Sequence, residues 1–310
     1  MYLGIDIGGT NLKSGIINEI GNLIEQSSIP TNAEKGPEEV INNLKKIIHV
    51  AKNNFPELKS VGVGVPGIVT NEGVVRISPN LPGWIDLPLK KKLEEFISIP
   101  IKIDNDANSA AIAELELGAG RDQNNFIYIT LGTGVGGAII INKKIFRGDT
   151  GASGEIGHTI INVNAKSNCY TNSFRSGVLE EYIGRKQIIE LAKIIMKKFP
   201  DSNLNKLSNV DVSSISDAAA MNDIAAIECF KKIGCYLGVG IASAMNLLDI
   251  STAIIGGGIS MSDSVLFDSA LETTRKRVLP PIASRVQIRM AHFTKDAGII
   301  GAALIGKKLL

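Results

Sequence analysis

Two stretches of the 310-residue chain decide the fold: residues 2–18 read YLGIDIGGTNLKSGIIN and residues 126–142 read FIYITLGTGVGGAIIIN. Aligned without gaps, both consist of an apolar strand, a glycine-containing turn and a second apolar strand that ends in Ile-Ile-Asn. Apolar hairpins can resemble each other by chance, so a single match of this kind decides little. The pair nevertheless predicts two domains that each open with the same hairpin.

Short apolar runs and helical segments alternate on both sides of these hairpins. Further strands are predicted at 61–65, 101–104, 252–255 and 286–290, because these runs are short, apolar and bounded by turn residues. Helices are predicted at 37–53, 107–117, 266–278 and from about residue 296. This alternation, together with the length of the chain, predicts an α/β protein of about two domains.

Composition and charge exclude several classes of protein. Lys and Arg number 33 against 31 Asp and Glu, so bulk charge predicts no nucleic-acid or membrane partner. Three cysteines are too few for a disulfide framework, and the N-terminus has no signal-peptide pattern, which together predict a reducing, cytoplasmic location. Asp249 and three glycines interrupt the apolar run 236–261, which predicts a buried helix and then a strand. We therefore expect a small-molecule partner.

Three glycine motifs fail the tests for known nucleotide-binding loops. Residues 62–67 and 132–137 match G-x-G-x-x-G, but neither is followed by the helix that holds a pyrophosphate in dinucleotide-binding folds. Residues 301–307 approach a P-loop, but Lys308 replaces the Ser or Thr that would bind Mg²⁺. We interpret all three as other kinds of structure.

Two glycine turns within the repeated hairpins are suited to binding phosphate. Each places a small hydroxyl residue among glycines, where consecutive backbone N–H groups can hold an anion. An ordinary tight turn would look the same, but a matching pair is less expected by chance. The two turns are predicted to hold successive phosphates of ATP through Gly8, Gly9, Thr10, Gly132, Thr133 and Gly134.

Five motifs, in order along the chain, resemble those of the ROK sugar kinases, especially the bacterial glucokinases. They are DIGGT at 6–10, NDAN at 105–108, LGTGVGG at 131–137, GEIGH at 154–158 and GGG at 256–258. The resemblance spans nearly the whole chain. It implies the actin-like ATPase fold, in which two ribonuclease H-like α/β domains flank an active-site cleft. We expect a smaller N-terminal domain at 1–120, completed by the C-terminal helix 296–310, and a larger domain at 121–295.

Asp106 is the candidate base for transfer of a phosphoryl group from ATP to a sugar hydroxyl. It follows the predicted strand 101–104 and begins a helix, and a helix N-terminus favours an ionised carboxylate. An Asp in this position is also typical of an ordinary N-cap. The family resemblance is what implies a catalytic aspartate here, and it also implies that Asn105 binds the sugar.

Sugar contacts are expected from a carboxylate and an imidazole three residues apart. Glu155 and His158 can each direct hydrogen bonds to a sugar hydroxyl, whereas His49 and His292 are interpreted as structural. The resemblance implies further sugar contacts and a turn near the adenosine. The sugar contacts are Gly67, Asn80 and Glu180, and the turn comprises Gly256, Gly257 and Gly258.

Two charged residues flank the first phosphate turn. Asp6 can orient hydrated Mg²⁺, although an acid at a strand end is also common for turn formation alone. Lys13 can contact phosphate or can be an exposed residue of its strand. We expect ATP and Mg²⁺ as the cofactors.

The sequence departs from the family pattern after His158. There the family has C-x-C-G-x-x-G-C, whose thiolates join the histidine in a structural zinc site. This chain has one cysteine in the segment, Cys169, and Val178 stands at the position of the last family cysteine. We therefore predict no zinc site and expect His158 to act on the sugar alone.

These observations predict an ATP-dependent sugar kinase that converts D-glucose to glucose 6-phosphate. Fructose, mannose, N-acetylmannosamine and allose are the alternative sugars, because the same contacts recur across the family. A non-catalytic sugar sensor is a second alternative, against which Asp106 argues; the start of the motif at Asp6 also leaves no room for the DNA-binding domain of the ROK repressors. An actin- or chaperone-like ATPase is a third, against which Glu155 and His158 argue. The resemblance also implies a homodimer.

Overall fold

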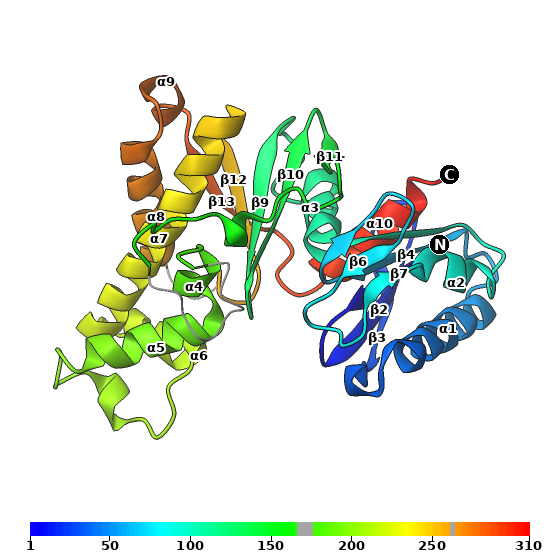
Figure 1. Cartoon of the computed structure of the whole chain (residues 1–310), viewed down its shortest axis with the longest axis horizontal. Coiled ribbons are helices and arrows are strands. Elements are labelled where there is room, and N and C mark those ends of the chain that lie inside the picture. The colour runs from blue at the N-terminus through cyan, green and yellow to red at the C-terminus, as the bar shows by residue number, and fades with distance from the viewer. Residues whose placement is uncertain (166–175, 261–263) are drawn as a thin grey trace. The chain divides into compact units, whose positions relative to one another are not determined.

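The computed structural model describes residues 1–165, 176–260 and 264–310, which form two compact units (Figure 1). Unit 1 comprises Met1–Asn124, Ala138–Ser153 and Lys295–Leu310, and unit 2 comprises Asn125–Gly137 and Gly154–Thr294. Within the described ranges, no helix combines the length and the apolar character needed to span a membrane.

Unit 1 is built on a five-stranded sheet with the order β3-β2-β1-β4-β8. The strands are β1 (Tyr2–Ile7), β2 (Asn11–Ile17), β3 (Leu23–Pro30), β4 (Ser60–Val65) and β8 (Ile101–Asn105). Strand β2 is antiparallel to both β1 and β3, whereas β1, β4 and β8 are parallel. The carboxyl ends of the three parallel strands therefore lie along one edge of the sheet, where sites in α/β proteins are commonly built.

Helices cover both faces of this sheet. They are α1 (Pro37–Asn54), α2 (Leu89–Glu94), α3 (Asp106–Glu116) and α10 (Ala297–Lys307), with the short 3-10 helix η1 (Ala33–Lys35). Side chains alternate between the faces of a strand, so Leu3, Ile5 and Ile7 of β1 share a buried cluster with α1, while Gly4 faces α10. A Cβ atom at Gly4 or Gly62 would collide with the backbone of α10, so this close approach requires glycine at both positions.

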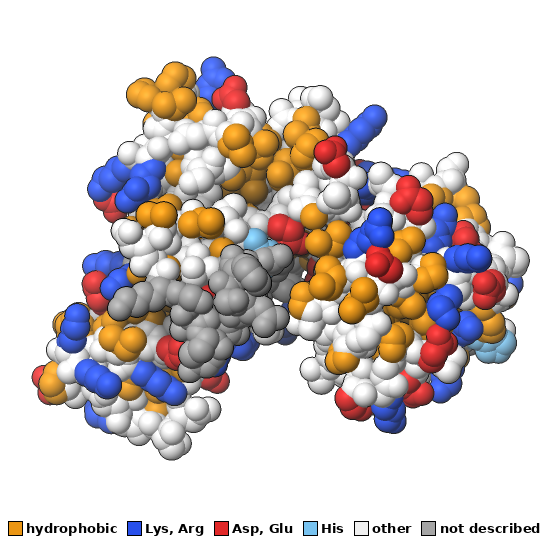
Figure 2. Space-filling model, in the orientation of Figure 1, with side chains coloured by type: hydrophobic (Ala, Val, Ile, Leu, Met, Phe, Trp, Pro, Cys, Tyr) orange, Lys and Arg blue, Asp and Glu red, His pale blue; other side chains and the backbone are white. Residues whose placement is uncertain are grey.

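A small antiparallel sheet follows β4 in the chain, with the order β5-β6-β7. Its strands are β5 (Ile68–Val69), β6 (Val75–Ile77) and β7 (Ile85–Leu87). The loop between β6 and β7 is held by the buried side chains of Leu81 and Trp84, and the N–H of Trp84 donates to the carbonyl of Leu81 at 3.2 Å. On the visible surface of unit 1, basic and acidic side chains are interspersed (Figure 2), in keeping with the balanced composition.

The second sheet repeats the strand order of the first. Its order is β11-β10-β9-β12-β13, with β9 (Phe126–Leu131), β10 (Val135–Ile141), β11 (Lys144–Phe146), β12 (Thr252–Gly256) and β13 (Gln287–Met290). Strand β12 is parallel to β9 and β13, and β11 is antiparallel to β10. Strand β10 begins in unit 2 and continues into unit 1. The repeat predicted from the opening hairpins is confirmed, because each sheet has an opening hairpin with one strand beyond it and two parallel strands on its other side.

Unit 2 is mainly helical outside this sheet. Its helices are α4 (Glu180–Ile183), α5 (Arg185–Met196), α6 (Val212–Ala220), α7 (Ile224–Leu248), α8 (Ser264–Arg277) and α9 (Pro280–Ala283), with the 3-10 helices η2 (Ile156–His158) and η3 (Asn203–Lys206). Helix α7 followed by β12 is the buried helix and strand predicted for the apolar run. Helices α7 and α8 lie close together at Gly234 and Gly238, where an added Cβ would meet the α8 backbone at 2.5 and 2.7 Å.

Candidate functional site

Asn105 closes β8 and caps the N-terminus of α3. Its side-chain Oδ1 accepts a hydrogen bond from the N–H of Asn108 at 3.0 Å, and its Nδ2 donates to the carbonyl of Gly67 at 2.9 Å. Gly67 has φ 111° and follows β4, and a Cβ there would collide with the carbonyl of Ile77. Two residues predicted to bind the sugar, Asn105 and Gly67, are therefore joined at the carboxyl edge of the sheet.

Asp106 occupies the first position of α3, one residue after the cap. Its Oδ1 accepts a hydrogen bond from the N–H of Ala107 at 2.8 Å. Asn105, and not Asp106, makes the N-cap hydrogen bond of α3. Helix capping therefore does not explain why a carboxylate occupies position 106. The helix N-terminus favours its ionised form.

Asp104 and Arg147 support this strand end, and sequence reasoning missed both. Asp104 is 4% exposed, and its carboxylate accepts hydrogen bonds from the Asn105 N–H at 2.8 Å and the Asn108 Nδ2 at 2.9 Å. The Arg147 guanidinium adds an ion pair at 2.6 Å. Asp104 thus fixes the residues on either side of Asp106. A buried carboxylate is stabilised by a nearby cation. Arg147 lies 43 residues after Asp104 in the chain, so no local sequence pattern could predict that the two side chains pair.

Asp6 lies near the end of β1, opposite Lys13 in the antiparallel pairing with β2. Burial raises the pKa of Asp6, and the charge of Lys13 partly opposes that rise. No residue in the described part of the chain donates a hydrogen bond to its carboxylate, and a Cβ at Gly298 of α10 would lie 2.7 Å from Asp6 Oδ2. A half-buried carboxylate without donors fits a nearby cation such as hydrated Mg²⁺.

The turn at residues 8–10 is held by hydrogen bonds to its own backbone. The Gly8 N–H donates to the Asn11 carbonyl at 2.9 Å, and Thr31 Oγ1 donates to the Gly8 carbonyl at 2.6 Å. Gly9 and Thr10 are exposed. A Cβ at Gly9 would lie 3.8 Å from the Asn80 carbonyl, so the predicted sugar residue Asn80 lies beside this predicted phosphate turn.

Two predicted nucleotide turns lie side by side in unit 2, at the ends of the parallel strands β9 and β12. The first turn, 132–134, is closed by a bond from the Gly132 N–H to the Gly134 carbonyl at 3.0 Å. In the second, 256–258, Gly257 has φ 88°, and a Cβ there would collide with the backbone of Leu131. The Ile259 N–H also donates to the Leu131 carbonyl at 3.2 Å. The structure therefore brings these two predicted turns together.

Glu180 lies against the turn at 132–134. Its Oε2 accepts a hydrogen bond from the N–H of Val135 at 2.7 Å, and a Cβ at Gly134 would collide with the same carboxylate. Sequence reasoning assigned Glu180 to the sugar, and no sequence feature pointed to its bond with the backbone that follows the turn.

Glu155 precedes the short helix η2, and His158 is its last residue. His158 Nε2 lies 3.9 Å from Glu155 Oε2, and both side chains are about a third exposed, at 37% and 34%. Gly157 lets this segment approach β10, because a Cβ there would collide with the Val135 carbonyl. A β-bridge between Ile160 and Val178 then joins the segment to the residues before α4. Glu155, His158 and Glu180 therefore belong to one connected region of unit 2.

No metal cluster is present among the residues the structure describes. Nowhere in 1–165, 176–260 and 264–310 do three or more His, Cys, Asp or Glu side chains gather in a way that could hold an ion. Cys169, on which the zinc prediction depends, falls outside the described residues. The absence of zinc therefore stays a prediction.

Comparison with known proteins identifies the family of this chain. A family model described as ROK family matches residues 2–308. A glucokinase of Halalkalibacterium halodurans is 33% identical over 316 residues, covering 99% of this chain and 95% of the relative. The crystal structure of a ROK family glucokinase from Streptomyces griseus in complex with glucose and AMPPNP superposes with a TM-score of 0.83 at 29% identity, covering 99% of both chains. A ROK family transcriptional regulator, a homologue of the E. coli MLC protein, has a TM-score of 0.89 at 25% identity and covers 99% of this chain and 78% of its own.

Proposed function

The chain belongs to the ROK family, and from that premise we propose that it transfers the γ-phosphoryl group of ATP to the 6-hydroxyl of D-glucose. The product is glucose 6-phosphate. The actin-like ATPase fold of the family accounts for the two repeated sheets. Several of the residues that we assign to this reaction follow strands of these sheets.

The strand end of β8 is the observation that carries the proposal. Asp106 presents a carboxylate whose place at the helix start is not explained by capping, because Asn105 is the cap. In the proposed reaction Asp106 accepts the proton of the sugar hydroxyl as the new O–P bond forms. Asp104 and Arg147 hold the neighbouring residues in place, and such support keeps a reacting group in the productive orientation.

Polar side chains and one glycine supply the proposed sugar contacts. We assign these contacts to Gly67, Asn80, Asn105, Glu155, His158 and Glu180, as the family resemblance implies. A carboxylate and an imidazole that direct hydrogen bonds to particular hydroxyls discriminate against sugars that lack them, because the protein groups would then be left unpaired.

Backbone turns supply the proposed nucleotide contacts. We assign the phosphates to Gly8, Gly9, Thr10, Lys13, Gly132, Thr133 and Gly134, and the adenosine to Gly256, Gly257 and Gly258. Asp6 would hold Mg²⁺ through water, and the ion when bound would neutralise charge on the transferring phosphates. The absence of hydrogen-bond donors to Asp6 in the described residues supports this role.

An ADP-release assay over a panel of sugars tests the proposal. The panel is glucose, fructose, mannose, N-acetylmannosamine and allose, each with ATP and Mg²⁺. We expect the highest kcat/KM with glucose. A higher value with another sugar would show that glucose is not the preferred substrate, while the proposed phosphoryl transfer would still hold. Glucose binding without ADP release would identify a sensor, and ADP release without any sugar would identify an ATPase.

Assembly and location complete the proposal. We propose a homodimer, as the family resemblance implies, and a cytoplasmic location, as the low cysteine content predicts. Light scattering coupled to size-exclusion chromatography gives the mass directly, to be compared with the 33.0 kDa of one chain. A mass of one chain at micromolar concentration would contradict the dimer.

A further inference from the structure

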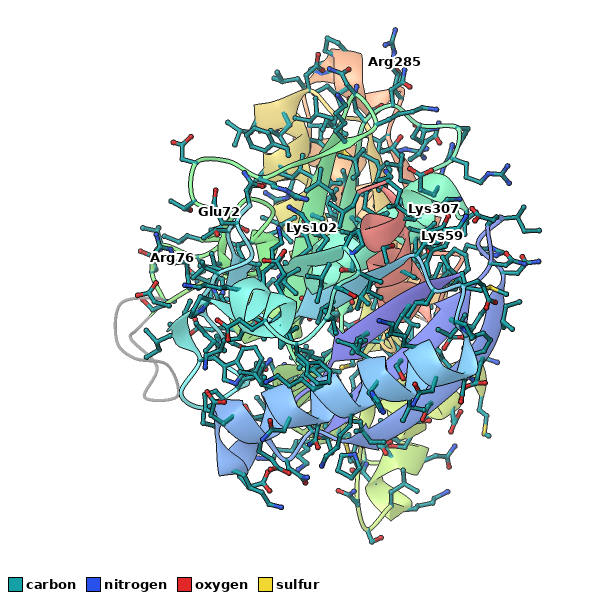
Figure 3. All side chains as sticks on the ribbon, turned by 90° about the vertical axis from the view of Figure 1, so that its right-hand side faces the viewer. Lys59, Glu72, Arg76, Lys102, Arg285 and Lys307 are labelled. Carbon is teal, nitrogen blue, oxygen red and sulfur yellow. The ribbon has the colours of Figure 1, made fainter. Side chains whose placement is uncertain are left out.

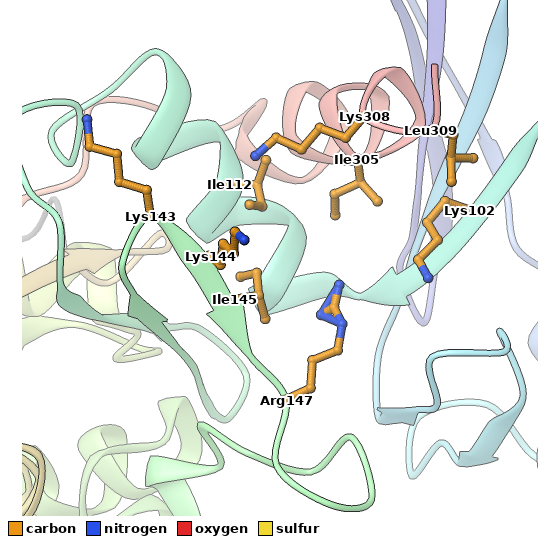
Figure 4. Close-up of a pocket in the computed structure, with 9 residues that line it drawn as sticks. All are labelled: Lys102, Ile112, Lys143, Lys144, Ile145, Arg147, Ile305, Lys308 and Leu309. Atoms are coloured by element: carbon orange, nitrogen blue, oxygen red, sulfur yellow. The ribbon is translucent and has the colours of Figure 1, made fainter.

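A pocket of about 270 Å³ in unit 1 is lined mainly by basic side chains (Figure 4). Five of its nine lining residues are cations, and they come from β8, from the β10–β11 hairpin and its following loop, and from the C-terminal end of α10. They are Lys102, Lys143, Lys144, Arg147 and Lys308. None of the nine is among the residues assigned above to the sugar, ATP or Mg²⁺.

Carboxylates neutralise only part of this charge. Lys308 pairs with Glu116 at 2.6 Å, and Arg147 pairs with Asp104 at 2.6 Å. Lys102 donates to the backbone carbonyl of Asn71 at 2.9 Å, and it forms no ion pair within the described residues. Lys143 and Lys144 are exposed and likewise have no ion-pair partner in that part of the chain. Three of the five lining cations therefore have no ion-pair partner among the residues that the structure describes.

The electrostatics of Lys102 agree with an excess of positive charge. Burial lowers the pKa of Lys102, and the positive charge of Arg147 lowers it further, against the opposing effects of Asp104 and Glu72. Figure 3 shows Lys102 and Glu72 on the same side of unit 1. An anion in the pocket would offset the repulsion between Lys102 and Arg147, because it would attract both cations.

Arg147 adds a donor without an acceptor. Its Nη2 contacts Asp104, whereas its Nη1 is buried and has no hydrogen-bond partner among the described residues. An unpaired buried donor is costly, and an anionic oxygen at the edge of the guanidinium would satisfy it. Arginine and lysine together are the side chains that proteins use to bind phosphate.

Apolar side chains form the rest of the wall. They are Ile112, Ile145, Ile305 and Leu309. The volume lies below the range of roughly 300–1,000 Å³ that is typical of drug-sized ligands, so the occupant is small. Apolar contact would also favour a phosphate ester with a short carbon chain over the bare ion.

We propose that this pocket is a second anion site, which binds a small compound of the phosphate class with at least two negative charges. The site lies apart from the residues of the proposed transfer reaction and goes beyond that reaction. Arg147 connects the two, because the guanidinium that lines the pocket also holds Asp104 beside Asn105 and Asp106.

Titration calorimetry in Mg²⁺-free buffer tests the proposal, with pyrophosphate, inorganic phosphate and butyl phosphate as separate probes. AMPPNP at saturation fills the nucleotide site. We expect at least one probe to bind in its presence, and the Lys102→Gln/Lys144→Gln variant to bind that probe about tenfold more weakly, because two charges are lost while a polar side chain is kept at each position. Tightest binding of pyrophosphate would identify condensed phosphate as the ligand, and tightest binding of butyl phosphate would identify a phosphate ester.

A matched control removes two lysines elsewhere. Lys231 and Lys232 are adjacent and exposed on α7, and Lys231→Gln/Lys232→Gln is expected to bind the probe as the unmodified protein does. If circular dichroism shows that the pocket variant is unfolded, Lys144→Gln alone replaces it, because that side chain is exposed. Equal affinity of the pocket variant and the control, displacement of every probe by AMPPNP, or no binding at all would overturn the proposal. No turnover is measured, so a failure of the sugar kinase assay leaves this result readable.

Discussion

The two sheets share one strand order and carry different chemistry at their carboxyl ends. In unit 1 the parallel strands end at polar side chains, namely Asp6, Asn105 and Asp106. In unit 2 the equivalent strands β9 and β12 end in glycine turns that offer backbone groups. The repeat thus supplies equivalent positions, whereas the residues at the strand ends decide what each position does.

The units also differ in how their helices meet their neighbours. Helix α10 approaches the strands of unit 1 so closely that Gly4 and Gly62 are required. In unit 2 the close approach is between two helices, α7 and α8, at Gly234 and Gly238. Helix α10 contacts both the sheet and α3, which leaves it little freedom to shift. A helix that packs against one other helix can move by tenths of an ångström.

The largest effect is expected at the helix starts. Asp106→Ala should lower kcat by about 10² to 10⁴, the usual contribution of a general base, with little change in stability because Asn105 is the cap. Asp211→Ala, at the N-cap of α6 in unit 2, should leave kcat unchanged and lower the free energy of unfolding by about 1 kcal/mol. Steady-state kinetics and urea unfolding of both variants measure this contrast. Near-normal turnover of a folded Asp106→Ala would refute the base assignment.

Glycine substitutions test whether the contact between α10 and the sheet is more rigid than the contact between α7 and α8. Gly62→Ala places a Cβ against the carbonyl of Ala302, and we expect a loss of about 3 kcal/mol or more. Gly238→Ala meets the Ala270 carbonyl at 2.7 Å, but it gains about 1 kcal/mol of helix propensity, so its loss should be clearly smaller. Urea midpoints followed by circular dichroism compare the two. Equal losses would show that the helix pair is as rigid as the contact between sheet and helix.

A substitution of Glu180 tests whether this side chain contacts the sugar or the nucleotide. Glu180→Gln should raise the KM for glucose about tenfold, as expected for one lost charged hydrogen bond, while the KM for ATP stays within about twofold. A rise in the KM for ATP alone would instead assign Glu180 to the turn at 132–134, against which it lies. Glu228→Gln, an exposed residue of α7, serves as the control.

The smallest expected effect concerns stability and pH at Asp6. Burial raises its pKa, so ionisation is less favourable in the folded protein than in the unfolded chain. This destabilising contribution is absent below the ordinary pKa, where both states are protonated, and it develops as pH rises through the folded-state pKa. Asp6→Asn should therefore have a Tm at or above that of the unmodified protein at neutral pH, with the difference vanishing in acid. Thermal melts against pH test this, and the exposed Asp268→Asn of unit 2 should show no such trend.

The parts of the fold that depend on local apolar patterns were predictable from the sequence. The predicted helix at 37–53 is α1 (Pro37–Asn54), and the strand predicted at 61–65 is β4 (Ser60–Val65). Strand β3 was not predicted, because its residues are mostly exposed and polar at the edge of the sheet and show no alternation. The strand beside Asp106 was predictable, whereas the role of Arg147 depends on a pairing over 43 residues that no local pattern encodes.

Helix α10 belongs to unit 1 but is the last helix of the chain, so unit 1 is completed only after unit 2 has been synthesised. Residues 297–307 cover one face of the sheet formed by β1, β4 and their neighbours, yet the ribosome makes them after every residue of unit 2. During synthesis, the sheet of unit 1 therefore has an apolar face that α10 does not yet cover. At that stage all residues of unit 2 have already been made. Exposed apolar surface of this kind is what chaperones bind. A chain truncated after residue 294 and released from the ribosome should contain a protease-resistant unit 2 and a protease-sensitive unit 1.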